Sequence, residues 1–401
     1  MRIAIITDDY LPDSTLVHAK MLHELAVELI AQKHEPIVIC PGSIDQKVSL
    51  QTDNIDGVKI WRFKSGQTRG VGKVKRAINE TLLSFNAWRS ISTKVKETSF
   101  DGVIYYSPSI FFGPLVKKIK KLNNCNSYLI LRDSFPQWAV DEGLIRPDSL
   151  IEKYFRYFEA INYDAANAIG LMSPRNLDIF DVTHSQRYNS HVLYNWADDN
   201  PSIDDNDYVD VRHELDLYGK TIFFYGGNIG HAQDIPNLLR LAESMKADEK
   251  VHFLFVGQGD QVALVKSKIG DGSSNISFLP SVNQNRFRHI LSQVDVGLFS
   301  LAYSHKVHNF PGKILGYMVE SLPILGSVNP NNDLLDVIND SNSGCVYTNG
   351  EDEELLFAAN KLANDIEYRK LLGMNARQLL NDSFSVKSAA TTIMSSLFKS
   401  N

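Results

Sequence analysis

Short apolar segments with strand character alternate with helical patterns along this chain, and the alternation limits the possible folds more than any other feature. After the first expected strand, Met21, Leu22, Leu25 and Leu29 fall on one face of a helix. Strands separated by helices are typical of parallel sheets covered by helices, so the sequence predicts an α/β fold. The expected strands are 2–8, 36–40, 58–63, 103–106, 127–132, 168–172, 191–194, 221–225, 252–256, 276–279 and 294–300.

The alternation is interrupted at 198–218 by a stretch that is rich in aspartate and poor in large apolar residues. This composition is typical of a linker, and a chain of 401 residues can bury more than one hydrophobic core. We therefore expect an N-terminal domain over 1–197, an acidic linker over 198–218 and a C-terminal domain over 219–383. The apolar stripe of 384–401 would be exposed on a free helix, so we expect this helix to pack back on the first domain.

Composition narrows the class of protein. The net charge of −6 argues against a nucleic-acid binder. Cys40, Cys125 and Cys345 are far apart and lack zinc spacing, which indicates reduced thiols in a cytoplasmic protein. Residues 2–7 are too short for a signal peptide, and no apolar run has the length of a membrane span. We therefore expect a cytoplasmic enzyme whose contact with any membrane is peripheral.

The segment 305–326 carries the clearest signal of a site. Its polar loop leads through a Pro-Gly pair into an expected helix. Backbone N–H groups at the start of a helix favour anions, and a lysine beside them adds positive charge. We therefore predict that this segment grips the diphosphate of an activated sugar. The residues assigned to donor binding here are Lys306, Asn309, Phe310, Pro311 and Gly312, and those assigned to catalysis are His308 and Lys313.

Glycine turns follow two strands of the expected C-terminal domain. Gly226, Gly227 and Asn228 follow the first strand, and Gly257 follows the second. Glycine allows the backbone to approach a ligand closely, although an ordinary strand-to-helix turn is the alternative in both places. The first turn lacks the Gly-Lys-Ser/Thr of a nucleoside-triphosphate P-loop. The first strand of the chain is not followed by Gly-x-Gly-x-x-Gly, which disfavours a dehydrogenase.

Charged residues at the end of another apolar strand indicate a role on the acceptor side. Arg132 and Asp133 follow strand 127–132. A structural ion pair is one explanation, and the functional alternative places Asp133 beside an acceptor hydroxyl or the donor sugar. Residues 205–207, Asp-Asn-Asp, match a metal-binding pattern of some sugar transferases. They lie in the acidic linker, away from any strand end, so we interpret them as a solvated charge run and expect no metal.

Two basic segments in the first half suggest contact with an anionic bilayer. One is the loop that contains Lys73, Lys75 and Arg76, and the other is 111–121, which begins with Phe111 and Phe112. The alternative is a solvated helix face and a mobile loop. The membrane residues expected in the second segment are Lys117, Lys118, Lys120 and Lys121, with the two phenylalanines as wedges.

Five short motifs occur in a characteristic order. They are Val192-Leu193-Tyr194-Asn195-Trp196, Tyr225-Gly226-Gly227-Asn228-Ile229-Gly230, Val256-Gly257-Gln258-Gly259, Phe278-Leu279-Pro280 and Phe310-Pro311-Gly312-Lys313. Their order resembles that of the retaining group 1 (family-4) glycosyltransferases of GT-B architecture, over essentially the whole chain. In detail the chain is similar to bacterial O-antigen transferases that pass N-acetyl-L-fucosamine from a UDP donor to a lipid-linked N-acetylglucosamine.

This resemblance implies two Rossmann-like domains that face a cleft, with the last helix crossing back to the first. It implies a UDP-sugar as donor substrate, no cofactor, and Pro280 among the donor contacts. The implied acceptor is linked to undecaprenyl diphosphate, and the implied location is the anionic inner face of the plasma membrane. The leaving phosphate takes the acceptor proton in retaining members, so Asp133 would position the acceptor.

The chain departs from the family pattern at several positions. An Arg and a Lys usually follow the glycine turn, where this chain has Ala232-Gln233. His308 and Gly316 occupy the positions of two family glutamates, and Glu320 is the possible substitute for the one that binds ribose. Lys306 and Lys313 are the replacement cations. Instead of a glycine-rich turn after the first strand, the chain has Ser14 and Thr15, which we assign to the acceptor side.

Two other classes of function stay open. A sugar-nucleotide 2-epimerase shares the GT-B layout but needs no acceptor, so it would isomerise a UDP-sugar supplied alone. A non-catalytic scaffold for polysaccharide assembly is compatible with the missing glutamate and Arg-Lys pairs. Such a scaffold would bind UDP without turnover.

Overall fold

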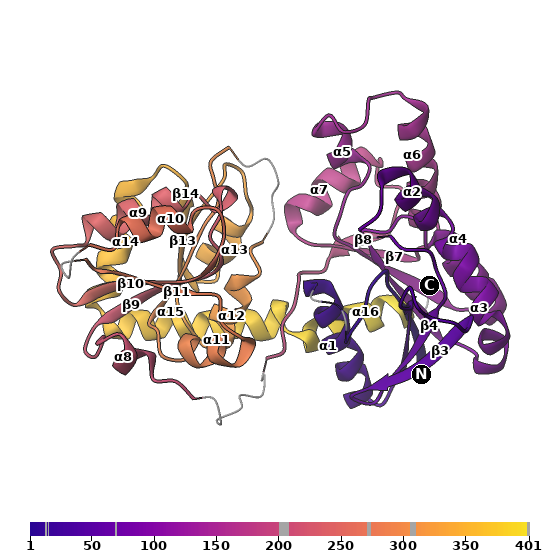
Figure 1. Ribbon diagram of the computed structural model, residues 1–401, viewed down its shortest axis with the longest axis horizontal. Helices are drawn as coiled ribbons and strands as arrows, with labels where there is room; N and C mark the ends of the chain where they lie inside the picture. Colours follow the sequence, from indigo (N-terminus) through magenta and orange to yellow (C-terminus); the bar gives the residue numbers. More distant parts are fainter. Residues whose placement is uncertain are drawn as a thin grey trace. The chain divides into compact units, whose positions relative to one another are not determined.

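The computed structural model describes residues 1–12, 14, 16–68, 70–199, 208–270, 274–304 and 310–398. The chain forms two compact units (Figure 1). The first comprises Met1–Tyr194 together with Val386–Asn401, and the second comprises Asn195–Ser385. The expected N-terminal domain ended at 197, close to Tyr194, whereas the expected linker over 198–218 falls within the second unit. Each unit contains one predominantly parallel sheet, which confirms the predicted α/β class.

The sheet of the first unit has the order β3-β4-β2-β1-β5-β6-β7-β8. Its neighbouring strands are parallel except at β3 and β4, which form an antiparallel hairpin. Asp56 and Gly57 form the two-residue turn of the hairpin, with positive φ angles of 50° and 83°. An Asp-Gly pair is a typical sequence signal for such a turn. The strands are β1 (Arg2–Ile6), β2 (Glu35–Pro41), β3 (Leu50–Ile55), β4 (Val58–Phe63), β5 (Gly102–Ser107), β6 (Asn126–Leu131), β7 (Ala168–Leu171) and β8 (Ser190–Val192).

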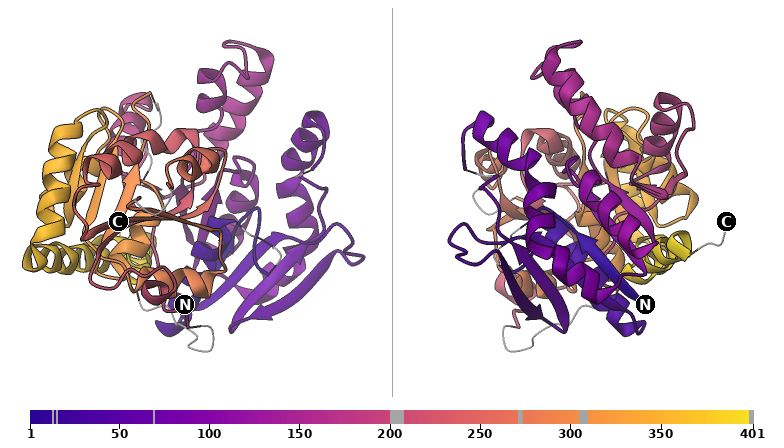
Figure 2. Two further views of the ribbon diagram at one scale, coloured as in Figure 1. Left: turned by 60° about the vertical axis from the view of Figure 1, so that its left-hand side comes forward. Right: turned by 90° about the vertical axis from the view of Figure 1, so that its right-hand side faces the viewer.

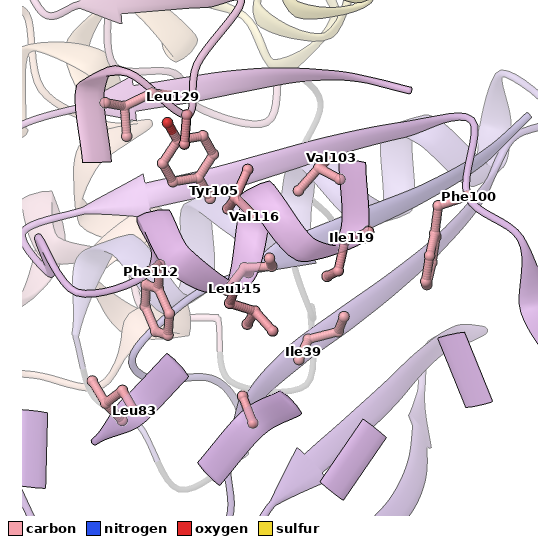
Figure 3. Close-up of a cluster of buried hydrophobic side chains, with 14 of the residues drawn as sticks. Ile39, Leu83, Phe100, Val103, Tyr105, Phe112, Leu115, Val116, Ile119 and Leu129 are labelled. Carbon is pink, nitrogen blue, oxygen red and sulfur yellow. The ribbon is translucent and has the colours of Figure 1, made fainter. Parts of the chain in front are cut away.

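Helices join these strands, and their apolar side chains pack against those of the sheet to form the core (Figure 3). Leu115, Val116 and Ile119 of α4 are completely buried beside Val103 and Tyr105 of β5. Each such side chain contributes about 1.5–3 kcal/mol by leaving water. The helices of this unit are α1 (Val17–Ala31), α2 (Lys73–Thr81), α3 (Leu83–Thr98), α4 (Gly113–Asn123), α5 (Gln137–Asp141), α6 (Leu150–Tyr163), α7 (Pro174–Thr183) and α16 (Val386–Phe398).

Helix α16 belongs to the first unit although it follows the whole second unit in the chain. Its Ile393 and Leu397 are buried, and the Nδ2 atom of Asn126 in β6 donates a 2.9 Å hydrogen bond to the carbonyl of Leu397. The predicted return of the last helix to the first domain is therefore confirmed.

The sheet of the second unit is parallel throughout, with the order β11-β10-β9-β12-β13-β14. Its strands are β9 (Thr221–Asn228), β10 (Val251–Gln258), β11 (Ile276–Pro280), β12 (Val296–Ser300), β13 (Ile324–Val328) and β14 (Gly344–Thr348). The α-helices are α8 (Val211–Glu214), α9 (Ile235–Ser244), α10 (Val262–Ser267), α11 (Gln284–Leu291), α12 (Lys313–Val319), α13 (Leu334–Asp340), α14 (Asp352–Asn364) and α15 (Ile366–Leu379).

The described part of the expected linker is built into the second unit. Arg212 of α8 donates to the backbone carbonyls of Gln293 at 2.8 Å and Lys220 at 2.9 Å, and it pairs with Asp295 at 2.7 Å. Asp295 also accepts a 2.7 Å bond from the backbone N–H of Ile222 at the start of β9. Residues 208–218 thus fasten the start of the unit to its sheet.

Candidate functional site

The glycines at the carboxyl ends of β9 and β10 have separate roles. The strands pair in register, so that Gly227 lies opposite Gly257. A Cβ atom on Gly257 would lie 1.8 Å from the carbonyl oxygen of Gly227, and one on Gly226 would lie 2.7 Å from the Phe287 ring. These two glycines are required by packing. Gly227 has a φ of 109° and open space where a side chain would be, so its exposed backbone is accessible to a ligand.

The turn after β9 is held in one conformation by its own side chains. The Tyr225 hydroxyl donates to the carbonyl of Asn228, and the Asn228 amide donates to Gln233 at 2.9 Å. The 3-10 helix that follows, His231–Gln233, accepts a 2.9 Å bond at the Ala232 carbonyl from the backbone N–H of Ala302 after β12. The glycine turn therefore has a fixed position relative to the end of β12.

Lys313 begins α12 and places its amine beside this turn. The Nζ atom lies 3.3 Å from the centroid of the Tyr225 ring. It is buried, and within the described residues it has no hydrogen-bond partner. Burial lowers the pKa of Lys313 well below its usual value. A buried amine that lacks an acceptor is well suited to receive an anion.

Helix α12 is fixed against β9 and β12 by Tyr317, and the segment before the helix is anchored by Phe310. The Tyr317 hydroxyl donates to the Leu298 carbonyl at 2.8 Å and accepts from the backbone N–H of Gly226 at 3.4 Å. Phe310 is buried and stacks on Phe384, with 6.2 Å between ring centroids. Phe310 therefore anchors the segment. Pro311 and Gly312 connect this anchor to Lys313, and Lys306, His308 and Asn309 lie outside the described residues.

Glu320 ends α12 and is half-buried, and burial raises the pKa of its carboxyl. Arg377 and Arg288 act in the opposite direction through their positive charges. Arg377 also donates to the Val319 carbonyl at 2.8 Å, so it fixes the end of the helix. Pro280 ends β11, where it pairs with Gly257 at the same edge of the sheet as the glycine turn.

Polar side chains in the first unit gather where β1, β5 and β6 end. His18 stacks on Tyr106, with 4.9 Å between centroids and 17° between planes, and its Nε2 atom lies 3.5 Å from an oxygen of Asp8. Burial raises the pKa of Tyr106 to about 12, while the charge on Arg132 lowers it and those on Asp8 and Asp133 raise it. The sequence interpretation found Arg132 and Asp133 but missed His18 and Tyr106. The position of His18 in the first turn of α1, the helix that follows β1, was the available signal.

Arg132 and Asp133 differ in their surroundings. The Arg132 guanidinium donates to the carbonyls of Gly170 at 3.3 Å and Tyr194 at 3.1 Å, and burial lowers its pKa to about 10. Burial raises the pKa of Asp133 to about 6, against a hydrogen bond from Trp138 that lowers it. Burial thus weakens the charged form of both groups, and the charge of Asp133 changes around pH 6.

Ser14 is hydrogen bonded to Asp9, which lines a cavity of the first unit. Its hydroxyl donates to Asp9 at 2.7 Å, while Thr15 lies outside the described residues. Asp8 and Asp9 line a cavity of about 230 Å³ together with the backbone of Gly42 and Gly66. The carboxylates and backbone groups make this cavity polar.

The prediction that Phe111 and Phe112 insert into a membrane is wrong. Phe111 and Phe112 are buried, and the Phe111 ring lies 4.9 Å from that of Phe158 in α6. The Nζ atom of Lys120 donates to the Ala165 carbonyl at 2.8 Å, and that of Lys118 lies over the Trp88 ring. The side chains of Lys117, Lys118 and Lys121 are exposed on α4. The two aromatic side chains at the start of the segment are not at the surface, so they cannot insert into a membrane.

No group of three or more His, Cys, Asp or Glu residues that could hold a metal occurs in the part of the chain that the structure describes. The expected Asp-Asn-Asp at 205–207 falls outside that part. None of the described helices combines the length and apolar character needed to cross a bilayer.

Comparisons with known proteins agree with this arrangement. Residues 219–365 match the model of the glycosyl transferases group 1 family. The probable glycosyltransferase WbjE of Pseudomonas aeruginosa is 23% identical over 222 residues, which is 54% of either chain. The putative colanic acid biosynthesis glycosyl transferase WcaI of Escherichia coli (strain K12) is 22% identical over 74% of this chain and 76% of its own. The match to WbjE thus spans about half of that protein.

A similar solved structure is that of HepE from Anabaena in complex with UDP and glucose. It superposes with a TM-score of 0.63 at 13% identity, covering 99% of both chains. The fold is therefore the GT-B fold.

Proposed function

We propose that this chain, a glycosyltransferase whose residues 219–365 form a group 1 domain, moves a sugar from a UDP-sugar to a lipid-diphosphate-linked acceptor. The proposed donor sugar is N-acetyl-L-fucosamine and the proposed acceptor is N-acetylglucosamine linked to undecaprenyl diphosphate. The name of WcaI refers to colanic acid biosynthesis, and HepE was solved with UDP and glucose. These relatives support polysaccharide assembly and a UDP donor, and the motif resemblance supports the specific sugars.

The observation that carries the proposal is the state of Lys313. A lysine ammonium is costly to bury without an acceptor, because it loses its hydration and gains no partner. The amine of Lys313 nevertheless lies over the ring of Tyr225, a residue of the same strand as the exposed Gly227. The diphosphate of a UDP-sugar would supply the missing negative charge. It would also replace the Arg and Lys that the family usually carries after the glycine turn.

The proposed chemistry follows from charge. The bond between the anomeric carbon and the diphosphate oxygen breaks, and the acceptor hydroxyl oxygen bonds to that carbon. The proton of that hydroxyl passes to an oxygen of the leaving diphosphate, on which negative charge develops as UDP leaves. Lys313 and the backbone at Gly227 and Asn228 stabilise this charge, so the reaction proceeds without a metal. Asp133 positions the acceptor hydroxyl, and Arg132, Ser14 and Thr15 complete the acceptor side. Lys306, His308, Asn309 and Glu320 are proposed for the remaining donor contacts.

The proposed location is the cytoplasmic face of the plasma membrane, where a lipid-linked acceptor is found. The purified protein should transfer sugar from UDP-N-acetyl-L-fucosamine to a short-chain lipid diphosphate of N-acetylglucosamine, and turnover should survive EDTA. Loss of turnover on chelation, restored by Mg²⁺ or Mn²⁺, would disprove metal independence. An isomer formed from the UDP-sugar alone would favour the epimerase. UDP binding with no turnover on any lipid acceptor would favour the scaffold.

A further inference from the structure

Two helical segments of the first unit carry an exposed apolar surface that the transfer reaction does not explain. On α2 and the start of α3, the exposed residues are Val74, Ile78, Leu82 and Phe85, at helical spacing on one side. On α6, they are Leu150, Ile151, Tyr154 and Tyr157. Their exposed fractions run from 39% for Tyr154 to 85% for Leu150. We call these eight residues the apolar face.

The two halves of the apolar face belong together. The Thr81 hydroxyl at the end of α2 hydrogen bonds to the Tyr154 hydroxyl of α6. In Figures 1 and 2, α2 and α6 extend toward the same end of the first unit. The inner side of α6 is secured by Phe155 and Phe158, whose rings contact Phe111. The outer side is thus held in place by a packed core while remaining exposed, as a preformed binding surface requires.

Within the two segments that carry the apolar face, basic side chains outnumber acidic ones. The exposed charged residues among 74–89 and 150–157 are Lys75, Arg76, Arg89 and Lys153. The carboxylates of the same stretches, Glu80 and Glu152, are partly buried and paired with Arg76 and Arg156. The chain as a whole carries a net charge of −6, so this surface is basic against the average of the molecule. An amphipathic helix with apolar, aromatic and basic outer residues is typical of the interface of an anionic bilayer.

We propose that the apolar face enters the headgroup region of an anionic lipid bilayer and seats the first unit on it. Helix α2 follows β4, and α5 and α6 follow β6, so both segments leave from the sheet edge that carries Asp8 and Asp133. This inference rests on the proposed function for its purpose: with the first unit seated on the bilayer, the lipid of an acceptor can stay in the membrane while its sugar reaches this edge of the sheet. The exposed lysines of α4 add electrostatic attraction to anionic lipids, and the apolar face is the part that inserts into the bilayer.

The test is sedimentation of the full chain with vesicles of phosphatidylglycerol and phosphatidylcholine. The wild type should bind them and lose binding in high salt and on pure phosphatidylcholine. The variant Val74→Ser/Ile78→Ser/Leu150→Ser should partition at least about tenfold more weakly. A matched control is Phe357→Ser/Met374→Ser, because these side chains are 73% and 61% exposed on helices of the second unit. The control should bind as the wild type does.

Several outcomes would overturn the inference. The serine variant could bind vesicles like the wild type, or the wild type could fail to bind anionic vesicles. Light scattering could instead show that the wild type self-associates and the serine variant does not, which would assign the face to a second copy. Turnover of a water-soluble acceptor distinguishes the proposed function from the proposed membrane surface. The serine variant should keep this turnover while it loses vesicle binding. Vesicle binding without turnover in either protein would leave this inference standing and remove the proposed function.

Discussion

Lys313 and Tyr225 form a pair in which the Nζ atom of the lysine lies 3.3 Å from the centroid of the ring. Lys361 and Tyr368 form a similar pair at 3.7 Å, but Lys361 is exposed. Water can hydrate the amine of Lys361, whereas that of Lys313 is buried and has no hydrogen-bond partner among the residues described. Both pairs place an amine over a tyrosine ring, but only the amine of Lys313 is shielded from water. A comparison of the two lysines therefore tests whether a buried amine binds an anion.

We expect Lys313→Ala to lower the affinity for UDP and to reduce turnover more than tenfold while the fold stays intact. A charge-assisted contact in a closed site contributes about 2–4 kcal/mol. Isothermal titration with UDP and steady-state kinetics measure the two effects, and circular dichroism checks the fold. Lys361→Ala is the control and should behave as the wild type. Unchanged kinetics in Lys313→Ala would remove the residue from the site.

We expect UDP binding to take up a proton through Lys313. Burial lowers the pKa of this amine in the free protein, and a bound diphosphate would raise it again. Between those two pKa values binding adds a proton, so UDP affinity is highest at low pH and falls as pH rises through the window. Titration at about pH 8, where UDP itself is ionised, in buffers of different ionisation enthalpy gives the proton count. Equal uptake by wild type and Lys313→Ala would contradict the assignment.

We expect Asp133→Asn to stabilise the protein at neutral and higher pH. The folded pKa of Asp133 is about 6, above the value of about 3.9 in an unfolded chain. The free energy of unfolding contributed by this group is therefore highest below pH ~4 and is lost as pH rises to about 6. The variant should gain about 1–2 kcal/mol at pH ~8 and nothing near pH ~4 in urea unfolding. Glu142→Gln, at an exposed position, should show no such pH dependence.

We expect His18→Ala to impair transfer to the acceptor without changing the dissociation constant of UDP. His18 belongs to the first unit, where it stacks on Tyr106 and lies 3.5 Å from Asp8. UDP is proposed to bind the second unit. Turnover with the lipid-linked acceptor and titration with UDP distinguish the two effects, and His213→Ala on exposed α8 serves as the control. Equal losses of UDP affinity and turnover would indicate a general disturbance of the fold.

We expect Ile393→Asp to destabilise the first unit by about 3 kcal/mol or more, because the carboxylate would be buried without a partner. Thr391→Asp, two positions away on the outer side of α16, should have little effect. Thermal unfolding compares the two variants. Deletion of 384–401 should lower both the melting temperature and the solubility. A melting temperature for Ile393→Asp equal to that of the wild type would show that α16 contributes little to the first unit.

Most strands of the two sheets were predictable because they are local patterns of apolar residues, whereas the largely polar β3 and the edge strand β14 were not expected. The β9 and β10 glycine turns were also visible in sequence, and Gly227 kept the exposure that a ligand contact requires. The burial of Phe111 was not visible, because it depends on Phe158, which lies far away in the chain. A basic stretch that starts with two aromatic residues has the same sequence whether the rings point into the core or into a membrane.

The acceptor side shows the same limit in another form. Arg132 and Asp133 stood out because charged residues at the end of an apolar strand are uncommon. His18 and Tyr106 did not stand out, since a histidine in a helix and a tyrosine in a strand are ordinary. Their stacking, and the place of Asp8 beside them, arises only when β1 and β5 lie next to each other in the sheet. Parallel pairing joins residues that no local pattern connects.

The return of α16 to the first unit determines the order in which the protein can be completed. The ribosome releases β1 to β8 long before it reaches residues 386–398, so the surface of the first unit that α16 covers stays open while the second unit is made. The second unit is continuous in the chain and needs no later segment. Folding during synthesis should therefore finish with the N-terminal unit. Truncated chains that stop before residue 386 would leave a stable second unit joined to an incomplete first one.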